Sequence, residues 1–178
     1  MGEVKMIFVS GIHGVGKTYF CNMIGERLGI KAYSASELIA EKSNQVMASD
    51  KQVMDVDQNQ MFLQMAVNEM RMKQEEFILD GHFCLLNKEG EISRISPDLF
   101  SFLNPDKIVL LTEKTSVIAE RRLRRDGIFV NENSLCTFQE AEKKYAEEIA
   151  TTLNVQLIVS TGSNDLMNII EKIGEEKR

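Results

Sequence analysis

The sequence has little of what marks disordered, disulfide-rich or membrane-embedded chains. Only two of its 178 residues are proline and 43% are hydrophobic, which favours a folded globular chain over a disordered or collagen-like one. Its three cysteines, Cys21, Cys84 and Cys136, are widely spaced and form no CxxC pair, so the pattern indicates reduced thiols and no zinc site. The first apolar run, at 6–9, is too short for a signal peptide or a membrane span. We expect a cytoplasmic protein without a membrane partner.

The length and net charge of the chain indicate the number of domains and the kind of partner. At about 150 residues per domain, the length predicts a single domain over 1–178. The formal net charge is −6, and general nucleic-acid binding requires a basic surface. We therefore expect no nucleic-acid partner.

Apolar runs and helical patterns alternate along the chain. Strand-like runs occupy 4–10, 30–33, 76–81, 107–112 and 155–160, and helical patterns occupy 17–28, 34–42, 61–74, 97–103, 116–125, 137–153 and the residues from 164. Residues 82–96 resemble a hairpin that turns at 87–90, whereas 43–55 and 127–135 show no pattern. The Ser-x-x-Glu spacing of Ser34 and Glu37, and the similar Thr137 and Glu140, predict helix starts. The alternation predicts an α/β fold with a parallel sheet covered by helices on both faces.

Residues 11–18, GIHGVGKT, match the pattern GxxxxGK[ST] in full, after a predicted strand and at the start of a predicted helix. In this motif backbone N–H groups converge on phosphate oxygens, Lys17 neutralises phosphate charge and Thr18 ligates Mg²⁺. An accidental glycine-rich turn is the alternative, and the flanking elements disfavour it. We predict that the nucleotide is bound by Gly11, His13, Gly14, Val15, Gly16, Lys17, Thr18 and Tyr19. The motif does not itself require an imidazole at position 13.

Three further features carry charged or titratable groups. Asp80 ends an apolar run, as expected for a carboxylate that orients Mg²⁺, although a turn aspartate fits the same pattern. His82 fits a substrate-facing residue and an ordinary turn histidine equally well. Residues 121–126 hold four arginines in an acidic chain. Arg121 and Arg125 share a helix face that suits a bound phosphate, and a solvated basic helix end is the alternative.

Over most of its length the chain resembles the P-loop nucleoside monophosphate kinases, and in particular the archaeal-type adenylate kinases. The resemblance is carried by GIHGVGKT, by Asp80-Gly81-His82, by residues 104–109 and by Glu120-Arg121-Arg122-Leu123. The resemblance implies a three-layer P-loop kinase fold with a five-stranded parallel sheet, an acceptor-binding helical region at about 34–75 and a short lid-like segment at 121–136. It implies ATP and Mg²⁺ as cofactors, with Thr18 and Asp80 at the metal and Arg121, Arg122 and Arg125 as lid arginines. The candidate catalytic residues are Lys17, Asp80, Arg121 and Arg125.

The sequence departs from this family in its supply of arginines. None occurs between Arg125 and Arg178, and only Arg71 and Arg94 lie between Arg27 and Arg121. Because a monophosphate needs its charge neutralised, this places AMP in doubt as the acceptor. The predicted function is an ATP- and Mg²⁺-dependent phosphotransferase acting on a nucleoside monophosphate or a related small molecule. A P-loop ATPase or switch acting on a protein partner, and a binding module without turnover, are the alternatives.

Overall fold

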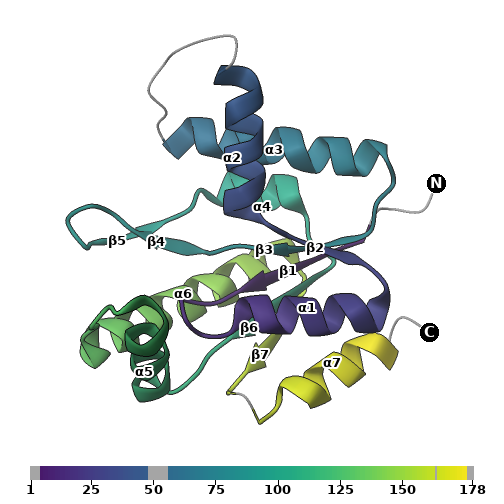
Figure 1. Ribbon diagram of the computed structural model, residues 1–178. Helices are drawn as coiled ribbons and strands as arrows, with labels where there is room; N and C mark the ends of the chain where they lie inside the picture. The colour runs from purple at the N-terminus through teal and green to yellow at the C-terminus, as the bar shows by residue number, and fades with distance from the viewer. Residues whose placement is uncertain (1–4, 48–55, 163, 176–178) are drawn as a thin grey trace.

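The computed structural model describes residues 5–47, 56–162 and 164–175. The elements in these ranges are, in chain order, β1 (Met6–Ser10), α1 (Lys17–Leu28), β2 (Lys31–Ser34), α2 (Ala35–Met47), α3 (Val56–Met72), β3 (Phe77–Asp80), β4 (Cys84–Leu86), β5 (Ile92–Arg94), α4 (Pro97–Leu103), β6 (Lys107–Leu111), α5 (Thr115–Asp126), α6 (Glu132–Leu153), β7 (Gln156–Ser160) and α7 (Leu166–Glu175). Figure 1 shows their arrangement.

The sheet has five strands in the order β2-β3-β1-β6-β7, and every pair is parallel. The central strand β1 pairs Val9 with Asp80 of β3 and Ser10 with Leu110 of β6. Parallel pairing brings the carboxyl ends of these strands to one edge of the sheet, where α/β proteins bind ligands. The predicted five-stranded parallel sheet is confirmed.

Alternate residues of each strand enter two separate cores, because successive side chains point to opposite faces. Met6 and Phe8 of β1 belong to the core under α2, α3, α4 and α6. Ile7 and Val9 belong to the core that α1, α5 and α7 cover. Figure 1 shows α1 and α7 together on one side of the sheet and α2, α3 and α4 on the other. The three-layer architecture is therefore confirmed.

Several element boundaries differ from the prediction. Helix α6 begins at Glu132 and not at Thr137, because the side chain of Asn131 accepts hydrogen bonds from the backbone N–H groups of Asn133 and Ser134. This cap satisfies the first free amides of the helix five residues earlier than predicted. Only 127–131 of the predicted pattern-free segment 127–135 lies outside a helix.

The predicted pattern-free segment 43–55 is also shorter, because α2 continues to Met47. Residues 48–55 lie outside the described part of the chain. Helix α3 begins at Val56, five residues before the predicted start at 61. The hydroxyl of Ser34, the last residue of β2, lies 2.9 Å from the hydroxyl of Ser36. The hairpin β4–β5 and helix α4 form as predicted.

None of the described helices is both long enough and apolar enough to cross a membrane.

Candidate nucleotide-binding site

The loop between β1 and α1 has a backbone that requires glycine. Gly14 and Gly16 have φ values of 92° and 109°, a region that side chains with a Cβ rarely adopt. A Cβ on Gly11 would lie 2.7 Å from the carbonyl oxygen of Leu111 on the neighbouring strand. The motif glycines therefore let the loop turn sharply into the N-terminus of α1, where free N–H groups favour an anion.

Lys17 joins this loop to the segment after β3. Its side chain is only 8% exposed, and its Nζ donates a hydrogen bond to the carbonyl oxygen of Gly11 at 2.6 Å. The same Nζ lies 3.2 Å from Nε2 of His82 and 3.9 Å from Oδ1 of Asp80. Three residues that the sequence analysis selected separately thus meet at one point.

Burial governs the titration of this cluster. Burial lowers the pKa of Lys17, and the nearby carboxylates of Asp80 and Glu142 oppose that shift. Burial raises the pKa of Asp80, which Lys17 opposes. Burial, together with the charge of Lys17, lowers the pKa of His82 to about 4. The His82 ring is therefore neutral near pH 7 and its Nε2 can accept a hydrogen bond from the lysine.

Glu142 of α6 holds the segment after β3 in place. Its carboxylate is buried, at 1% exposure, and accepts a hydrogen bond from the hydroxyl of Ser10 at the end of β1. It also accepts hydrogen bonds from the backbone N–H groups of Phe83, at 2.9 Å, and Cys84, at 2.7 Å. Burial raises the pKa of Glu142, and the three hydrogen bonds oppose that shift. The carboxylate ties the residues that follow His82 to the end of β1.

Glu142 was not predicted from the sequence, although a signal for it was present. Tyr145, Ala146 and Ile149 follow it at the i+3, i+4 and i+7 positions that define the buried face of α6. An acidic residue on such a face needs hydrogen-bond partners in the interior.

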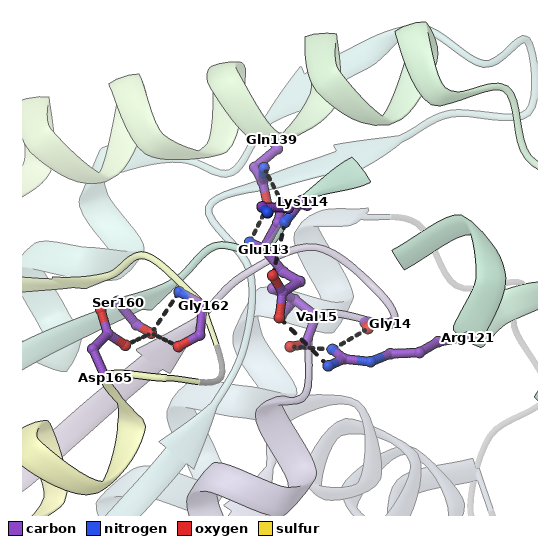
Figure 2. Close-up of polar contacts among 9 residues, drawn as sticks. All are labelled: Gly14, Val15, Glu113, Lys114, Arg121, Gln139, Ser160, Gly162 and Asp165. Carbon is purple, nitrogen blue, oxygen red and sulfur yellow. Dashed lines mark hydrogen bonds and ion pairs between the residues drawn. The ribbon is translucent and has the colours of Figure 1, made fainter. Parts of the chain in front are cut away.

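Arg121 contacts the phosphate-binding loop itself (Figure 2). Its Nη1 donates hydrogen bonds to the carbonyl oxygens of Val15, at 3.2 Å, and Gly14, at 3.5 Å. Its Nη2 lies 3.4 Å from Oε2 of Glu113, a residue just after β6. Gln139 fixes the backbone of Glu113 through hydrogen bonds from the Glu113 N–H and to its carbonyl oxygen. Arg121 therefore bridges the loop and the carboxyl end of β6.

The loop after β7 lies on the other side of Glu113. Ser160 donates a hydrogen bond to Oδ1 of Asp165 at 2.6 Å, and the same hydroxyl contacts Gly162 (Figure 2). A Cβ on Gly162 would lie 3.2 Å from Oε1 of Glu113. The Glu113 carboxylate thus lies between Arg121 and the loop that leads into α7.

The other predicted arginines occupy different surroundings. Nη2 of Arg125 lies 2.8 Å from Nε2 of His13, so the end of α5 touches the phosphate-binding loop. The aliphatic part of Arg122 packs against the loop, because a Cβ on Gly14 would lie 2.9 Å from its Cγ. Arg122 does not line the cavity described below, whereas Arg124 does.

A cavity of about 1050 Å³ opens beside this cluster. One part, which we name the P-loop half, is lined by His13, Gly14, Val15, Gly16, Lys17, Thr18, Tyr19, Arg121, Arg124, Arg125, Leu166 and Met167. The other part, the helical half, is lined by Phe8, Ser34, Ala35, Ser36, Ile39, Asn59, Gln60, Leu63, Leu85, Ile95, Leu99, Phe100 and Leu103. Asp80, Gly81 and His82 also line the cavity: Asp80 and His82 lie beside Lys17, and a Cβ on Gly81 would lie 2.8 Å from the Phe8 ring, so this segment joins the two halves. Of the predicted site residues, Gly11 and Arg122 lie outside this lining.

The two residues predicted at the metal fit a Mg²⁺ ion bound with a nucleotide. The hydroxyl-bearing Thr18 and the carboxylate of Asp80 line the same cavity. In the described ranges no three acidic, histidine or cysteine side chains gather into a metal cage. Mg²⁺ is commonly held by one or two protein groups, phosphate oxygens and water, so it needs no such cage.

The parallel sheet, the glycine-rich loop and the buried Lys17 at the start of α1 define a P-loop kinase fold. The chain belongs to the AAA_17 family, described as an AAA domain, whose family model matches residues 10–135. This membership bears out the resemblance drawn from the sequence motifs, and it makes the chain a member of a kinase-like, nucleotide-binding family.

Two archaeal proteins similar to this chain carry the name of a kinase. A protein of Methanocaldococcus jannaschii named "Putative adenylate kinase" is 28% identical over 183 residues, which cover 95% of this chain and 84% of the relative. A protein of the same name from Thermococcus gammatolerans is 26% identical, with 97% and 89% covered.

Two kinase structures share the fold. Shikimate kinase from Acinetobacter baumannii matches with a TM-score of 0.61 and 16% identity, over 96% of this chain and 90% of that one. A gluconokinase from Sinorhizobium meliloti matches with a TM-score of 0.58 and 19% identity, over 99% and 94%.

Proposed function

We propose that this protein is an ATP- and Mg²⁺-dependent phosphotransferase that moves the γ-phosphoryl group of ATP to a small-molecule acceptor. The observation that carries the proposal is the meeting of Lys17, Asp80 and His82 where the two halves of the cavity join. A phosphoryl group held at Lys17 would face an acceptor in the helical half. Phosphoryl transfer depends mainly on such positioning and on charge stabilisation, so it requires no covalent nucleophile.

The P-loop half would bind the donor. The N–H groups of the loop and the N-terminus of α1 suit phosphate oxygens, and Lys17 supplies a buried positive charge. Thr18 and Asp80 would hold Mg²⁺, directly or through water, and the bound ion would neutralise phosphate charge during transfer. We assign ATP rather than GTP as the donor because the archaeal relatives carry the name "Putative adenylate kinase".

The arginines of α5 would act on the same phosphates. Arg121, Arg124 and Arg125 line the P-loop half, and Arg121 already touches the loop carbonyls. A phosphate oxygen is a stronger acceptor for a guanidinium group than a neutral carbonyl, so bound ATP would draw Arg121 toward itself. We assign residues 121–136 to a lid-like segment and about 34–75 to the acceptor-binding region of one domain.

The free cysteines Cys21, Cys84 and Cys136 suit the reducing cytoplasm.

A nucleotide-dependent switch or ATPase acting on a protein partner remains the second candidate, because the same loop serves both classes. The helical half of the cavity favours the kinase, since hydrolysis needs only water beside the γ-phosphate.

Transfer of label from ATP separates the two candidates. The protein is incubated with Mg²⁺ and γ-³²P-labelled ATP, with and without nucleosides and nucleoside monophosphates, and the products are resolved by chromatography. A kinase places the label on an organic product, and the yield depends on the added acceptor. Label that appears only as inorganic phosphate, at the same rate with every addition, would contradict the kinase and support the switch.

A further inference from the structure

The helical half of the cavity is apolar and carries few polar groups. Its polar lining consists of the uncharged side chains of Ser34, Ser36, Asn59 and Gln60. The rest of its lining is aliphatic or aromatic, and it includes the edges of two core rings, Phe8 and Phe100, which are 2% and 1% exposed and pack edge to face at 5.7 Å between centroids. Such a surface binds a flat apolar group whose edge offers a few hydrogen-bonding atoms.

Positive charge is confined to the other half. Among the described residues that line the cavity, the cations are Lys17 and three arginines of α5. Those are the groups that the donor phosphates would engage.

Cations on the helices around the helical half are held by other groups. Lys42 of α2 pairs with Glu69 of α3 at 2.5 Å. Arg71 of α3 donates hydrogen bonds to the carbonyl oxygens of Phe102 and Leu103, at 3.0 and 2.6 Å. Both the Lys42 ammonium and the Arg71 guanidinium thus already contact acceptor groups of the protein, and neither side chain lines the cavity.

Apart from Lys17, which the donor phosphates would engage, the charges near the junction are carboxylates and are unfavourable to an anion. Asp80 lines the cavity between the halves, and Glu37 of α2 lies close enough to contribute to the raised pKa of Asp80, after burial. A phosphate or carboxylate on the acceptor would lie near these carboxylates without a described cation in the helical half to balance it.

We infer that the acceptor is a nucleoside: an uncharged molecule with a flat ring, hydrogen-bonding edges and a free hydroxyl. This inference rests on the proposed phosphotransferase function and names its acceptor. In the reaction, the nucleoside hydroxyl oxygen forms a bond to the γ-phosphorus, and the bond from that phosphorus to the β–γ bridging oxygen breaks. ADP leaves, and the hydroxyl proton is released to water.

The size of the cavity agrees with two ligands. Pockets for one small-molecule ligand occupy about 300–1,000 Å³, and the volume here, about 1050 Å³, lies just above that range. One nucleotide in the P-loop half leaves the helical half for a second, smaller ligand. The hydroxyl of that ligand would then face the junction formed by Asp80, Gly81 and His82.

Calorimetric binding tests the acceptor class directly. The protein is first saturated with Mg²⁺ and a non-hydrolysable ATP analogue, and is then titrated with adenosine, guanosine, cytidine and uridine and with their 5′-monophosphates. We expect at least one nucleoside to bind at least tenfold more tightly than its own monophosphate. Tighter binding of the monophosphates, or no binding of any nucleoside, would overturn the inference.

The first step of this titration separates the two proposals. Failure of the ATP analogue to bind would contradict the proposed function, and the nucleoside acceptor with it. Binding of the analogue followed by preference for a monophosphate would leave the phosphotransferase intact and overturn only the acceptor class.

A charge-gain variant adds a second test. In Ser36→Arg an arginine enters the helical half, and we expect the preference for the nucleoside over its monophosphate to fall at least tenfold. Ser93→Arg, on the exposed strand β5 outside the cavity, is the matched control and should leave the preference unchanged. If Ser36→Arg does not fold, Asn59→Arg makes the same test from α3. An unchanged preference in a folded variant would show that the acceptor does not lie in the helical half.

Discussion

Nζ of Lys17 lies 3.2 Å from Nε2 of His82, across 65 residues of sequence. The contact joins the phosphate-binding loop to the segment after β3, at the junction between the two halves of the cavity. Because a positive neighbour disfavours protonation of the imidazole, the pair is stable only with a neutral ring.

The first prediction concerns the protonation of His82. Burial and then Lys17 lower its pKa from 6.5 to about 4, so its ring should stay neutral from pH 8 down to about pH 5. NMR titration is decisive because the chain has only two histidines, and a His13→Gln variant assigns the signals. Titration of His82 near pH 6.5 would contradict the buried contact.

The same shift predicts how stability depends on pH. Between about pH 6.5 and pH 4 the unfolded chain binds more protons at His82 than the folded chain does, so this group makes the free energy of unfolding decrease as the pH falls. Urea unfolding of the wild type and of His82→Asn, at pH 7 and at pH 5, measures the contribution. The loss of stability between the two pH values should be smaller in the variant, and an equal loss would argue against it.

The second prediction concerns Glu142. In Glu142→Gln an amide group would face the N–H groups of Phe83 and Cys84, so one of the present hydrogen bonds would be lost. We expect a loss of about 1–3 kcal/mol in the free energy of unfolding and a fall in kcat larger than any rise in KM for ATP, because His82 would no longer be held in place.

Urea unfolding and initial-rate kinetics measure these two effects. Glu140→Gln, an exposed position on the same helix, is the control and should behave as the wild type. Wild-type kinetics in Glu142→Gln would show that the buried carboxylate serves stability alone.

The third prediction concerns the metal. Asp80→Asn removes a charged oxygen that Mg²⁺ would use while preserving the shape of the side chain. The Mg²⁺ concentration for half-maximal rate should rise about tenfold or more, because the carboxylate is one of few protein ligands. Asp98→Asn, outside the cavity, is the control. An unaltered Mg²⁺ dependence in Asp80→Asn would exclude the carboxylate from the metal site.

The fourth prediction concerns Arg121. Its guanidinium contacts the loop carbonyls and Glu113, so it lies beside the position proposed for the donor phosphates. Arg121→Ala should lower kcat on the order of 10³-fold if the arginine stabilises transition-state charge. Arg27→Ala, at an exposed position on α1, is the control. A loss confined to KM for ATP would limit Arg121 to ground-state binding.

Local signals account for what was predictable from the sequence. The turn into α1 depends on a motif of eight consecutive residues, so the loop and the bounds of that helix were predicted correctly. Four of the five strands were found because each is a short apolar run between turn signals, whereas β2, with the sequence KAYS, was predicted only as a short extended piece. The start of α6 was missed because Asn131 and Thr137 are both acceptable caps, and packing decides between them.

The contacts of the candidate site depend on long-range packing instead. Glu142 meets Ser10 across 132 residues, and Arg121 meets Val15 across 106 residues. The periodicity of apolar residues along the sequence does not indicate which distant residues meet in this way. The sequence also singled out Arg122, while the structure places Arg124 in the cavity lining, since which helix face meets the loop is set by how α5 packs.

The most direct test of the account is the rate of ADP formation from Mg-ATP and the preferred acceptor in the wild type and in Lys17→Ala. Loss of the buried ammonium should lower the acceptor-dependent rate on the order of 10²-fold or more, with an unchanged circular dichroism spectrum. Lys144→Ala, at an exposed position of α6, should retain the wild-type rate. Wild-type turnover in a folded Lys17→Ala variant would contradict phosphoryl transfer at this loop.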